Sequence, residues 1–212
     1  LPAALILLPQ ALVYSLTMRH ASCLLLACLM FATPASAEEA LPAPPEVAKS
    51  PAEMRSESLD RLFASLHTAG AEANAKTLEK KIWDLWMASD SPTAEVLLRQ
   101  ASKATDEGAP EEALKILDKL VERYPDFAEA WNRRATLYYL MRRYDAALAD
   151  IEKVLELEPR HFGALAGRGM IYQKKKNYAA AIDAYREALT MNPLMEGPKE
   201  ALEELERLEQ AI

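Results

Sequence analysis

The side chains that could perform catalytic or metal chemistry are few and widely spaced in this chain of 212 residues. His67 and His161 lie in distant segments, and neither has a second ligand at a useful spacing. Cys23 and Cys28 are the two cysteines, and both lie in an apolar N-terminal segment. No glycine-rich loop could hold a phosphate. An active site or metal centre needs several such groups brought together. We therefore expect no enzyme activity, no catalytic residue, no cofactor and no bound metal.

A repeat of 34 residues in the second half of the chain is the stronger signal. Small residues, aromatic residues and a proline mark one copy, at Trp131, Ala135, Tyr138, Tyr144, Ala147, Ile151, Val154 and Pro159. The positions 34 residues later are Leu165, Gly169, Tyr172, Tyr178, Ala181, Tyr185, Ala188 and Pro193. Those 34 residues earlier are Leu97, Ala101, Ala104, Pro110, Ala113, Leu117, Leu120 and Pro125. This period is typical of a helix–turn–helix unit. Its small residues allow two helices to approach closely, and its proline ends the second helix.

The three copies, residues 94–127, 128–161 and 162–195, resemble the tetratricopeptide repeat family. The resemblance implies an all-α fold, a right-handed superhelical solenoid in which neighbouring repeats bury one continuous core. Residues 57–93 have helical apolar spacing and predict a divergent, repeat-like hairpin that caps the N-terminal end. Residues 196–212 predict a polar-backed capping helix for the C-terminal end.

In this family the first helices of the repeats line a concave groove that holds a partner. The register places in this groove the residues that we take as the partner-binding set: Arg99, Asn132, Arg133, Thr136, Tyr139, Met170, Gln173 and Lys174. The same register adds Glu95, Leu98, Ser102, Glu129 and Ala166. This mixture of polar and apolar groups suits an extended peptide or a partner helix. The alternative for each side chain taken singly is solvated surface.

One kind of partner does not fit the same register. Family members that bind the C-terminal carboxylate of a chaperone use lysine, asparagine and arginine side chains at set positions. The corresponding residues here are Leu98, Ser102, Arg133, Gly163 and Gly167. None of them matches the residue that the family uses, so we expect no chaperone-tail partner.

Two pairs of side chains allow more than one interpretation. Trp83 and Trp86 are three residues apart and form either a ligand platform or part of the core packing. Arg134 and Arg168 occupy a repeat position that is usually apolar. We expect their aliphatic stems to pack and their charged heads to reach solvent.

The turns between the two helices of each repeat differ in charge. The first copy has Asp106-Glu107-Gly108, the second Arg142-Arg143 and the third Lys174-Lys175-Lys176. Stacking of the repeats should place these turns on one rim, acidic at one end and basic at the other. The basic end is either a solubilising surface or a contact for an anionic partner or envelope polymer.

The first 37 residues contain no acidic residue and predict a secretory signal peptide. Met18-Arg19-His20 is a short positive region, residues 21–31 are apolar, and Ala35-Ser36-Ala37 is a small-x-small cleavage site. We interpret residues 1–17 as an over-extended gene start that precedes the true initiator, Met18. There are two alternatives. In the first, Cys28 is a lipid-attachment site. In the second, the segment is a transmembrane anchor, but Pro34 interrupts the apolar run that such an anchor needs.

The remaining chain has the composition of an exported protein. Residues 38–56 contain four prolines and predict a disordered Pro/Ala-rich tether. The chain after residue 37 has no cysteine, which suits an oxidising compartment. Its 24 basic and 32 acidic residues give a formal charge of −8, which argues against nucleic acid as a partner.

The function that we expect from these features is that of a non-enzymatic scaffold in the bacterial periplasm. It should bind a protein or peptide and should not be an integral membrane protein once its signal is removed. One alternative is a lipid-anchored subunit of an envelope assembly. Another is a module that binds an envelope polymer or small ligand through the basic turns or the tryptophan pair.

Cleavage after Ala37 should leave Glu38 as the first residue of the mature protein. Mass spectrometry of protein purified from the cell envelope should find this N-terminus, and Ala37→Phe should block processing because the cleavage site requires a small residue. Retention of residues 18–37 would show that the cleavage prediction is wrong. An acylated Cys28 would establish the lipid-anchored alternative.

Overall fold

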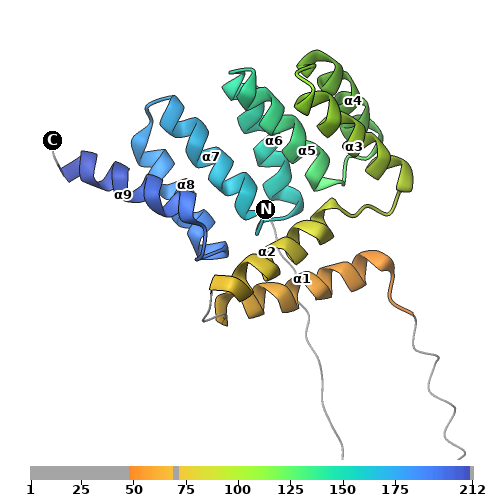
Figure 1. Cartoon of the computed structure of the whole chain (residues 1–212), viewed down its shortest axis with the longest axis horizontal. Helices are drawn as coiled ribbons and strands as arrows, with labels where there is room; N and C mark the ends of the chain where they lie inside the picture. Colours follow the sequence, from red (N-terminus) through yellow and green to blue (C-terminus); the bar gives the residue numbers. More distant parts are fainter. Residues whose placement is uncertain (1–47, 69–71, 211–212) are drawn as a thin grey trace, which may run out of the picture. The chain divides into compact units, whose positions relative to one another are not determined.

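The computed structural model describes residues 48–68 and 72–210, and within these ranges the chain is all helical (Figure 1). The helices are α1 (Pro51–Thr68), α2 (Glu72–Met87), α3 (Pro92–Asp106), α4 (Pro110–Arg123), α5 (Ala128–Leu140), α6 (Tyr144–Leu157), α7 (Phe162–Lys174), α8 (Tyr178–Met191) and α9 (Glu196–Gln210). None of these helices is long and apolar enough to cross a membrane. The predicted signal peptide (1–37), tether residues 38–47 and residues 211–212 of the predicted capping helix lie outside the described ranges.

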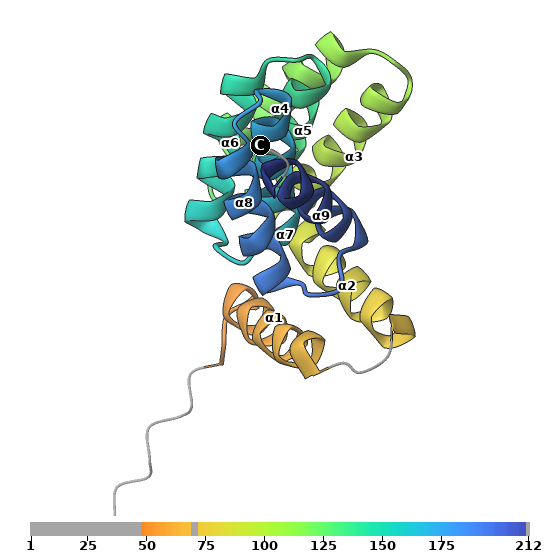
Figure 2. The ribbon, with the colours of Figure 1, turned by 90° about the vertical axis from the view of Figure 1, so that its left-hand side faces the viewer.

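Helices α3 to α8 form three antiparallel pairs, one for each repeat, and the pairs stack in chain order. Each second helix also packs against the next repeat, α4 on α5 and α6 on α7. Figure 2 shows α4, α6 and α8 together on one side of the stack. Helix α9 packs on α8 and buries Leu205 in a cluster with Tyr185. The predicted all-α solenoid with a C-terminal capping helix is therefore confirmed.

The prolines of the repeat mark the ends of the second helices as predicted. Helices α4, α6 and α8 end at Arg123, Leu157 and Met191, and a proline follows each of these residues by two positions. Proline cannot continue a helix because it lacks the backbone N–H and its ring clashes with the preceding turn. The chain must therefore turn at the same point of every repeat.

The small residues of the repeat lie at the closest helix contacts. Ala135 of α5 and Ala147 of α6 are buried in one cluster with Ile151. In the next repeat Gly169 and Tyr185 replace Ala135 and Ile151. A Cβ atom on Gly169 would lie 2.6 Å from the Tyr185 ring, so the larger aromatic side chain requires the smaller partner. Burial raises the pKa of Tyr185 to about 12.

The predicted N-terminal hairpin exists, but it does not extend the stack. Helices α1 and α2 pack on the edge of the stack where α7 begins and α8 ends, and α2 also contacts α5 (Figure 1). Their buried cluster contains Phe63 and Trp86 and includes Phe162 of α7. The repeat positions that must be small hold His67 and Glu79 instead. Without small residues, α1 and α2 pack on each other less closely than the paired helices of a repeat do, and the aromatic face of the hairpin packs on the edge.

Helix α1 begins at Pro51, which corrects the predicted tether at residues 51–56. The Ser50 hydroxyl accepts the Glu53 N–H at 3.2 Å, and the Glu53 carboxylate accepts the Ser50 N–H at 2.7 Å. This reciprocal capping satisfies two free N–H groups at the start of the helix. The bond from the Ser50 N–H lowers the pKa of Glu53. Proline is favourable in the first helical turn, so Pro51 helps to start this helix.

Polar contacts attach the hairpin to the edge of the stack. The His67 ring nitrogens lie 2.8 Å from the Phe63 carbonyl and 2.9 Å from the Thr190 carbonyl. Both carbonyls accept hydrogen bonds, so they favour the doubly protonated ring and raise the pKa of His67. Arg160 donates to Asp60 at 2.6 Å and lies over the Phe63 ring, 4.8 Å from its centroid. These contacts join α1 to the α6–α7 turn and to the end of α8.

Gly169→Ala should destabilise the protein by about 1–3 kcal/mol, because the added methyl group overpacks the contact with the Tyr185 ring. The free energy of unfolding can be measured by urea denaturation followed by circular dichroism. The double variant Gly169→Ala/Tyr185→Ile copies the Ala135–Ile151 pair of the second repeat. Its loss in free energy of unfolding should be smaller than the sum of the losses of the two single variants, because the two residues are in contact.

Gly197→Ala is the matched control, because no heavy atom lies within 4 Å of a Cβ placed there. It lies in α9 and should be neutral or stabilising by up to about 1 kcal/mol, as expected when alanine replaces glycine in a helix. Equal effects of the two alanine substitutions would contradict the proposed helix contact.

Candidate functional site

A hollow of about 490 Å³ lies between α5 and α7 on the side of the first helices. Helix α5 contributes Asn132, Arg133, Ala135, Thr136, Tyr139 and Leu140, and helix α7 contributes Gly163, Ala164, Ala166, Gly167, Met170 and Ile171. Trp83, Ile151 and Met195 complete the lining. Most of these residues are apolar, and Arg133 is the one with a formal charge. A volume and lining of this kind are typical of a binding site for a small ligand or a large apolar side chain.

The structure brings most of the predicted partner-binding set together. Five of its eight members line the hollow: Asn132, Arg133, Thr136, Tyr139 and Met170. Ala166, which the register added, lines it too. Arg99 and Lys174 are exposed outside the hollow, and Gln173 accepts a hydrogen bond from the Tyr185 hydroxyl at 3.0 Å. A role of these residues in binding stays a prediction.

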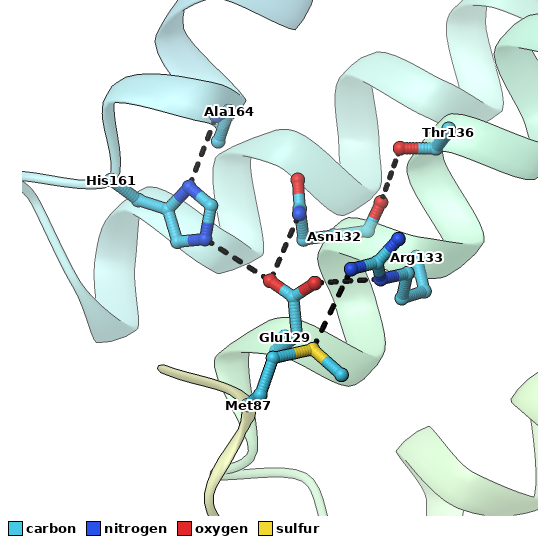
Figure 3. Close-up of polar contacts among 7 residues, drawn as sticks. All are labelled: Met87, Glu129, Asn132, Arg133, Thr136, His161 and Ala164. Atoms are coloured by element: carbon cyan, nitrogen blue, oxygen red, sulfur yellow. Dashed lines mark hydrogen bonds and ion pairs between the residues drawn. The ribbon is translucent and has the colours of Figure 1, made fainter. Parts of the chain in front are cut away.

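Three residues that the register placed on the groove surface are buried instead, and of these Asn132 is 9 % exposed and still lines the hollow. Leu98 is 1 % exposed and belongs to the core between α3 and α4. Glu129 is 0 % exposed, although it carries a carboxylate. Glu129 lies in the first turn of α5, where the turn before α7 and the end of α2 cover it (Figure 3). A buried carboxylate is costly unless it is paired, so its partners decide the local structure.

Three side chains surround the Glu129 carboxylate (Figure 3). Asn132 Nδ2 donates to Oε2 at 2.9 Å, and His161 Nε2 lies 3.3 Å from the same oxygen. Arg133 Nε is 2.7 Å from Oε1, an ion pair whose angle does not meet hydrogen-bond geometry. The carboxylate therefore joins one turn of α5 to the residue that precedes α7.

His161 has a structural role that its neighbours define. Its Nδ1 accepts the Ala164 N–H at 3.1 Å and so caps the start of α7. A nitrogen that accepts a hydrogen bond carries no proton, so the proton of the neutral ring is on Nε2 and points to Glu129. The ring also stacks on Trp86, with centroids 4.1 Å apart. Within the described part of the chain, no group of three or more potential metal ligands includes this histidine.

Arg133 is held by Glu129 but keeps hydrogen-bond donors available. Its Nε faces the buried carboxylate, and one terminal nitrogen contacts Met87 Sδ at 3.5 Å. Sulfur is a weak acceptor. The Arg133 side chain is 39 % exposed and lines the hollow. Its guanidinium can therefore donate to an acceptor on a bound partner, while the buried Glu129 carboxylate fixes its orientation.

The tryptophan pair divides into a core residue and a wall of the hollow. Trp86 is 6 % exposed and packs against His161 and Phe162, as the core interpretation predicted. Trp83 meets Trp86 edge to face and reaches the hollow. A Cβ atom on Gly163 would lie 2.7 Å from the Trp83 ring. The missing side chain of Gly163 thus allows the hairpin to close one end of the hollow.

The prediction that the charged head of Arg134 reaches solvent is wrong, because its side chain is only 16 % exposed. Its guanidinium donates to both carboxylate oxygens of Asp150 at 2.8 Å and to Asp118 at 2.9 Å. It also lies over the Trp131 ring, 5.0 Å from the centroid. The hydrogen bonds to Asp150 raise the pKa of Arg134. Arg134 therefore joins α5 to both α4 and α6, and Arg168 pairs with Glu187 at 2.6 Å.

Sequence comparison supports the repeat assignment. A family model described as tetratricopeptide repeat matches residues 128–161 and 163–193, and a second model with the same description matches residues 98–140. A TPR repeat-containing protein of Rhizobium etli is 38 % identical over 94 residues, which is 44 % of this chain and 46 % of that protein. The chain thus spans less than half of this curated relative.

Solved structures share the fold at low sequence identity. The first TPR of Spaghetti (RPAP3) bound to the HSP90 peptide SRMEEVD is 21 % identical with a TM-score of 0.54, covering 56 % of this chain and 94 % of that one. The Yersinia enterocolitica type III secretion chaperone SycD in complex with a YopD peptide is 16 % identical with a TM-score of 0.54. That match covers 57 % of this chain and 97 % of SycD.

Glu129→Ala should cost about 3–5 kcal/mol of stability, because it leaves the buried partners of the carboxylate uncompensated. Asp118→Ala is the matched control. Asp118 also pairs with an arginine, but its side chain is 50 % exposed, so its removal should cost at most about 1 kcal/mol. Urea denaturation measures both values. A Glu129 variant as stable as the Asp118 variant would contradict the structural role of the buried carboxylate.

Proposed function

Residues 98–161 and 163–193 belong to the tetratricopeptide repeat family, and we propose on this basis that the chain is a non-enzymatic scaffold that binds a peptide segment of a partner protein. The observation that carries the proposal is the hollow between α5 and α7. It lies on the first helices of two neighbouring repeats, where a stack of repeats offers an extended binding surface. SycD and the Spaghetti domain, which share this fold, hold peptides.

The lining of the hollow favours one large apolar side chain as the anchor of that peptide. Tyr139, Leu140 and Met170 lie along it, and Leu140 and Met170 are 60 % and 43 % exposed. An apolar side chain from a partner would remove this surface from water, which gains about 25 cal/mol for each Å² buried. Binding energy in interfaces concentrates on such central anchors.

Arg133 adds a charge preference to the apolar anchor. Its guanidinium is tied to buried Glu129 on one side and has free donors toward the hollow. A carboxylate that reaches these donors forms charge-assisted hydrogen bonds, which are stronger than neutral ones. We therefore expect the bound segment to carry an aspartate or glutamate close to its apolar anchor. The residues of the chaperone-tail clamp are absent, so this carboxylate belongs to a side chain.

The closed end of the hollow limits how the segment can lie. Trp83 of α2 and Met195 before α9 lie in its lining together with Gly163 and Ala164 in the first turn of α7. A segment that lies across the first helices can point its anchor into the hollow, whereas one that runs along α7 meets the Trp83 ring at Gly163. This geometry favours an extended peptide or one turn of helix over a long partner helix.

We place this scaffold in the bacterial cell envelope on the basis of its N-terminal sequence. The positive region at Met18-Arg19-His20, the apolar run 21–31 and the small residues at Ala35-Ser36-Ala37 support export. The absence of cysteine after Cys28 suits the periplasm. Attachment of lipid at Cys28 would place the same scaffold on a membrane surface.

Peptides selected from a phage-displayed library on the purified protein should share a large apolar residue near an aspartate or glutamate. Met170→Asp should lower their affinity at least about tenfold, because the anchor would then bury a carboxylate. Isothermal titration calorimetry with a synthetic peptide measures the effect.

Val96→Asp is the matched control for this substitution. Val96 is 42 % exposed, close to the 43 % of Met170, but it lies on α3 and outside the hollow. The Val96 variant should bind the selected peptides like the unaltered protein. Peptides that bind both variants equally well would place the binding site elsewhere.

A further inference from the structure

The turns between the paired helices share one unusual backbone conformation. Gly108 has φ 74°, and the residues 34 and 68 positions later, Arg142 and Lys176, have φ 59° and φ 60°. Side chains of L-residues disfavour this left-handed region, whereas glycine adopts it at no cost. The first repeat has glycine at this position, whereas the second and third have the cationic residues Arg142 and Lys176. Folding alone would favour glycine in all three turns.

These two cations belong to a larger basic surface. The basic rim consists of Arg142 and Arg143 in one turn and Lys174, Lys175 and Lys176 at the next, and all five side chains are exposed. Among the residues that the structure describes, only Lys175 of this set forms an ion pair, with Asp145. The chain as a whole carries a formal charge of −7, so the rim differs in sign from the rest of the molecule.

Exposed apolar side chains accompany the cations. Leu140 is 60 % exposed and Tyr178 is 44 % exposed, and each is two residues from a left-handed cation. The acidic turn of the first repeat has Asp106 and Pro110 at the equivalent positions. Cations and apolar groups therefore occur together at the second and third turns, and both are missing at the first.

The basic rim is remote from the hairpin. Helices α1 and α2 pack where α7 begins and α8 ends, whereas the rim lies at the other ends of these helices (Figure 1). Arg142, Lys176 and Tyr178 do not line the hollow between α5 and α7, whereas Leu140 belongs to both surfaces. A peptide anchored in the hollow would therefore leave the rim cations and Tyr178 free.

We propose that the basic rim docks on the surface of an anionic phospholipid bilayer. Cations attract the anionic headgroups, and exposed leucine and tyrosine side chains are favourable in the interfacial layer beneath them. Turn tips from two repeats present both kinds of group to a flat surface. An acidic peptide would instead need a groove with directed donors, and the hollow beside Gly108 and Leu140 is lined by Glu111. The bilayer therefore fits the rim better than a peptide does.

The double variant Arg142→Gly/Lys176→Gly tests this role because stability and binding should change in opposite directions. Relief of the left-handed conformation should raise the melting temperature by about a few degrees. The loss of two cations should lower the partition coefficient onto vesicles of phosphatidylcholine with phosphatidylglycerol by at least about tenfold. Sedimentation of the processed protein, which begins at Glu38, with vesicles measures this coefficient at low ionic strength, where screening is weak. Affinity for a peptide selected on the hollow should stay unchanged.

Lys115→Ala/Lys119→Ala on α4 is the charge-matched control and should keep vesicle binding. Tyr178→Ser, which changes no charge, should lower the part of the binding that resists high salt. The proposal would be overturned if the unaltered protein bound pure phosphatidylcholine vesicles as well as it binds vesicles with phosphatidylglycerol. It would also be overturned if the glycine variant bound the anionic vesicles as well as the unaltered protein does. Binding to a soluble polyanion with no binding to anionic vesicles would also overturn it and would assign the rim to an anionic polymer.

Discussion

The buried carboxylate of Glu129 links α5 to the start of α7, the two helices that form the hollow. An unpaired carboxylate is costly in the interior, and Asn132, Arg133 and His161 surround this one. Through His161 it reaches the capped start of α7, and through Arg133 it fixes the charged group of the hollow. One buried interaction thus sets both the position of α7 against α5 and the direction of the guanidinium.

The hairpin covers this interaction and shapes the hollow in doing so. Trp86 stacks on His161, and Trp83 lies against Gly163, where no side chain intervenes. A hairpin that continued the stack would leave the hollow open at this end. Because it packs on the edge, its Trp83 lines the hollow near the start of α7, and the basic rim lies at the other end of α7. The two proposed surfaces can therefore act at the same time.

The sequence was sufficient for the repeats because their constraints are local and periodic. Small residues such as Ala147 and the prolines at fixed intervals specify helix contacts and helix ends without knowledge of distant residues. The hollow was predicted in part for the same reason, since the register of α5 and α7 determines which faces they share. The start of α1 could also have been predicted, because Ser50, Pro51 and Glu53 form a helix-start signal that the proline content of the segment obscured.

The remaining features depend on contacts between distant residues, which no periodicity encodes. Glu129 has the spacing of a surface residue, and only the approach of His161 and α2 buries it. Trp83 and Met195 enter the hollow because the hairpin packs on an edge that the repeat pattern does not describe. Gly163 gave a partial signal, because a glycine within a helix indicates the close approach of another group, but the sequence does not identify Trp83 as that group.

The central claim is that a peptide partner places an apolar side chain in the hollow between α5 and α7. Nuclear magnetic resonance of protein with labelled methionine methyl groups, in complex with a selected peptide, tests it most directly. The account predicts intermolecular nuclear Overhauser effects from the peptide to the methyl groups of Met170 and Met195, which line the hollow. It predicts none to Met54, which is 50 % exposed on α1. Contacts to Met54 without contacts to Met170 would contradict the account.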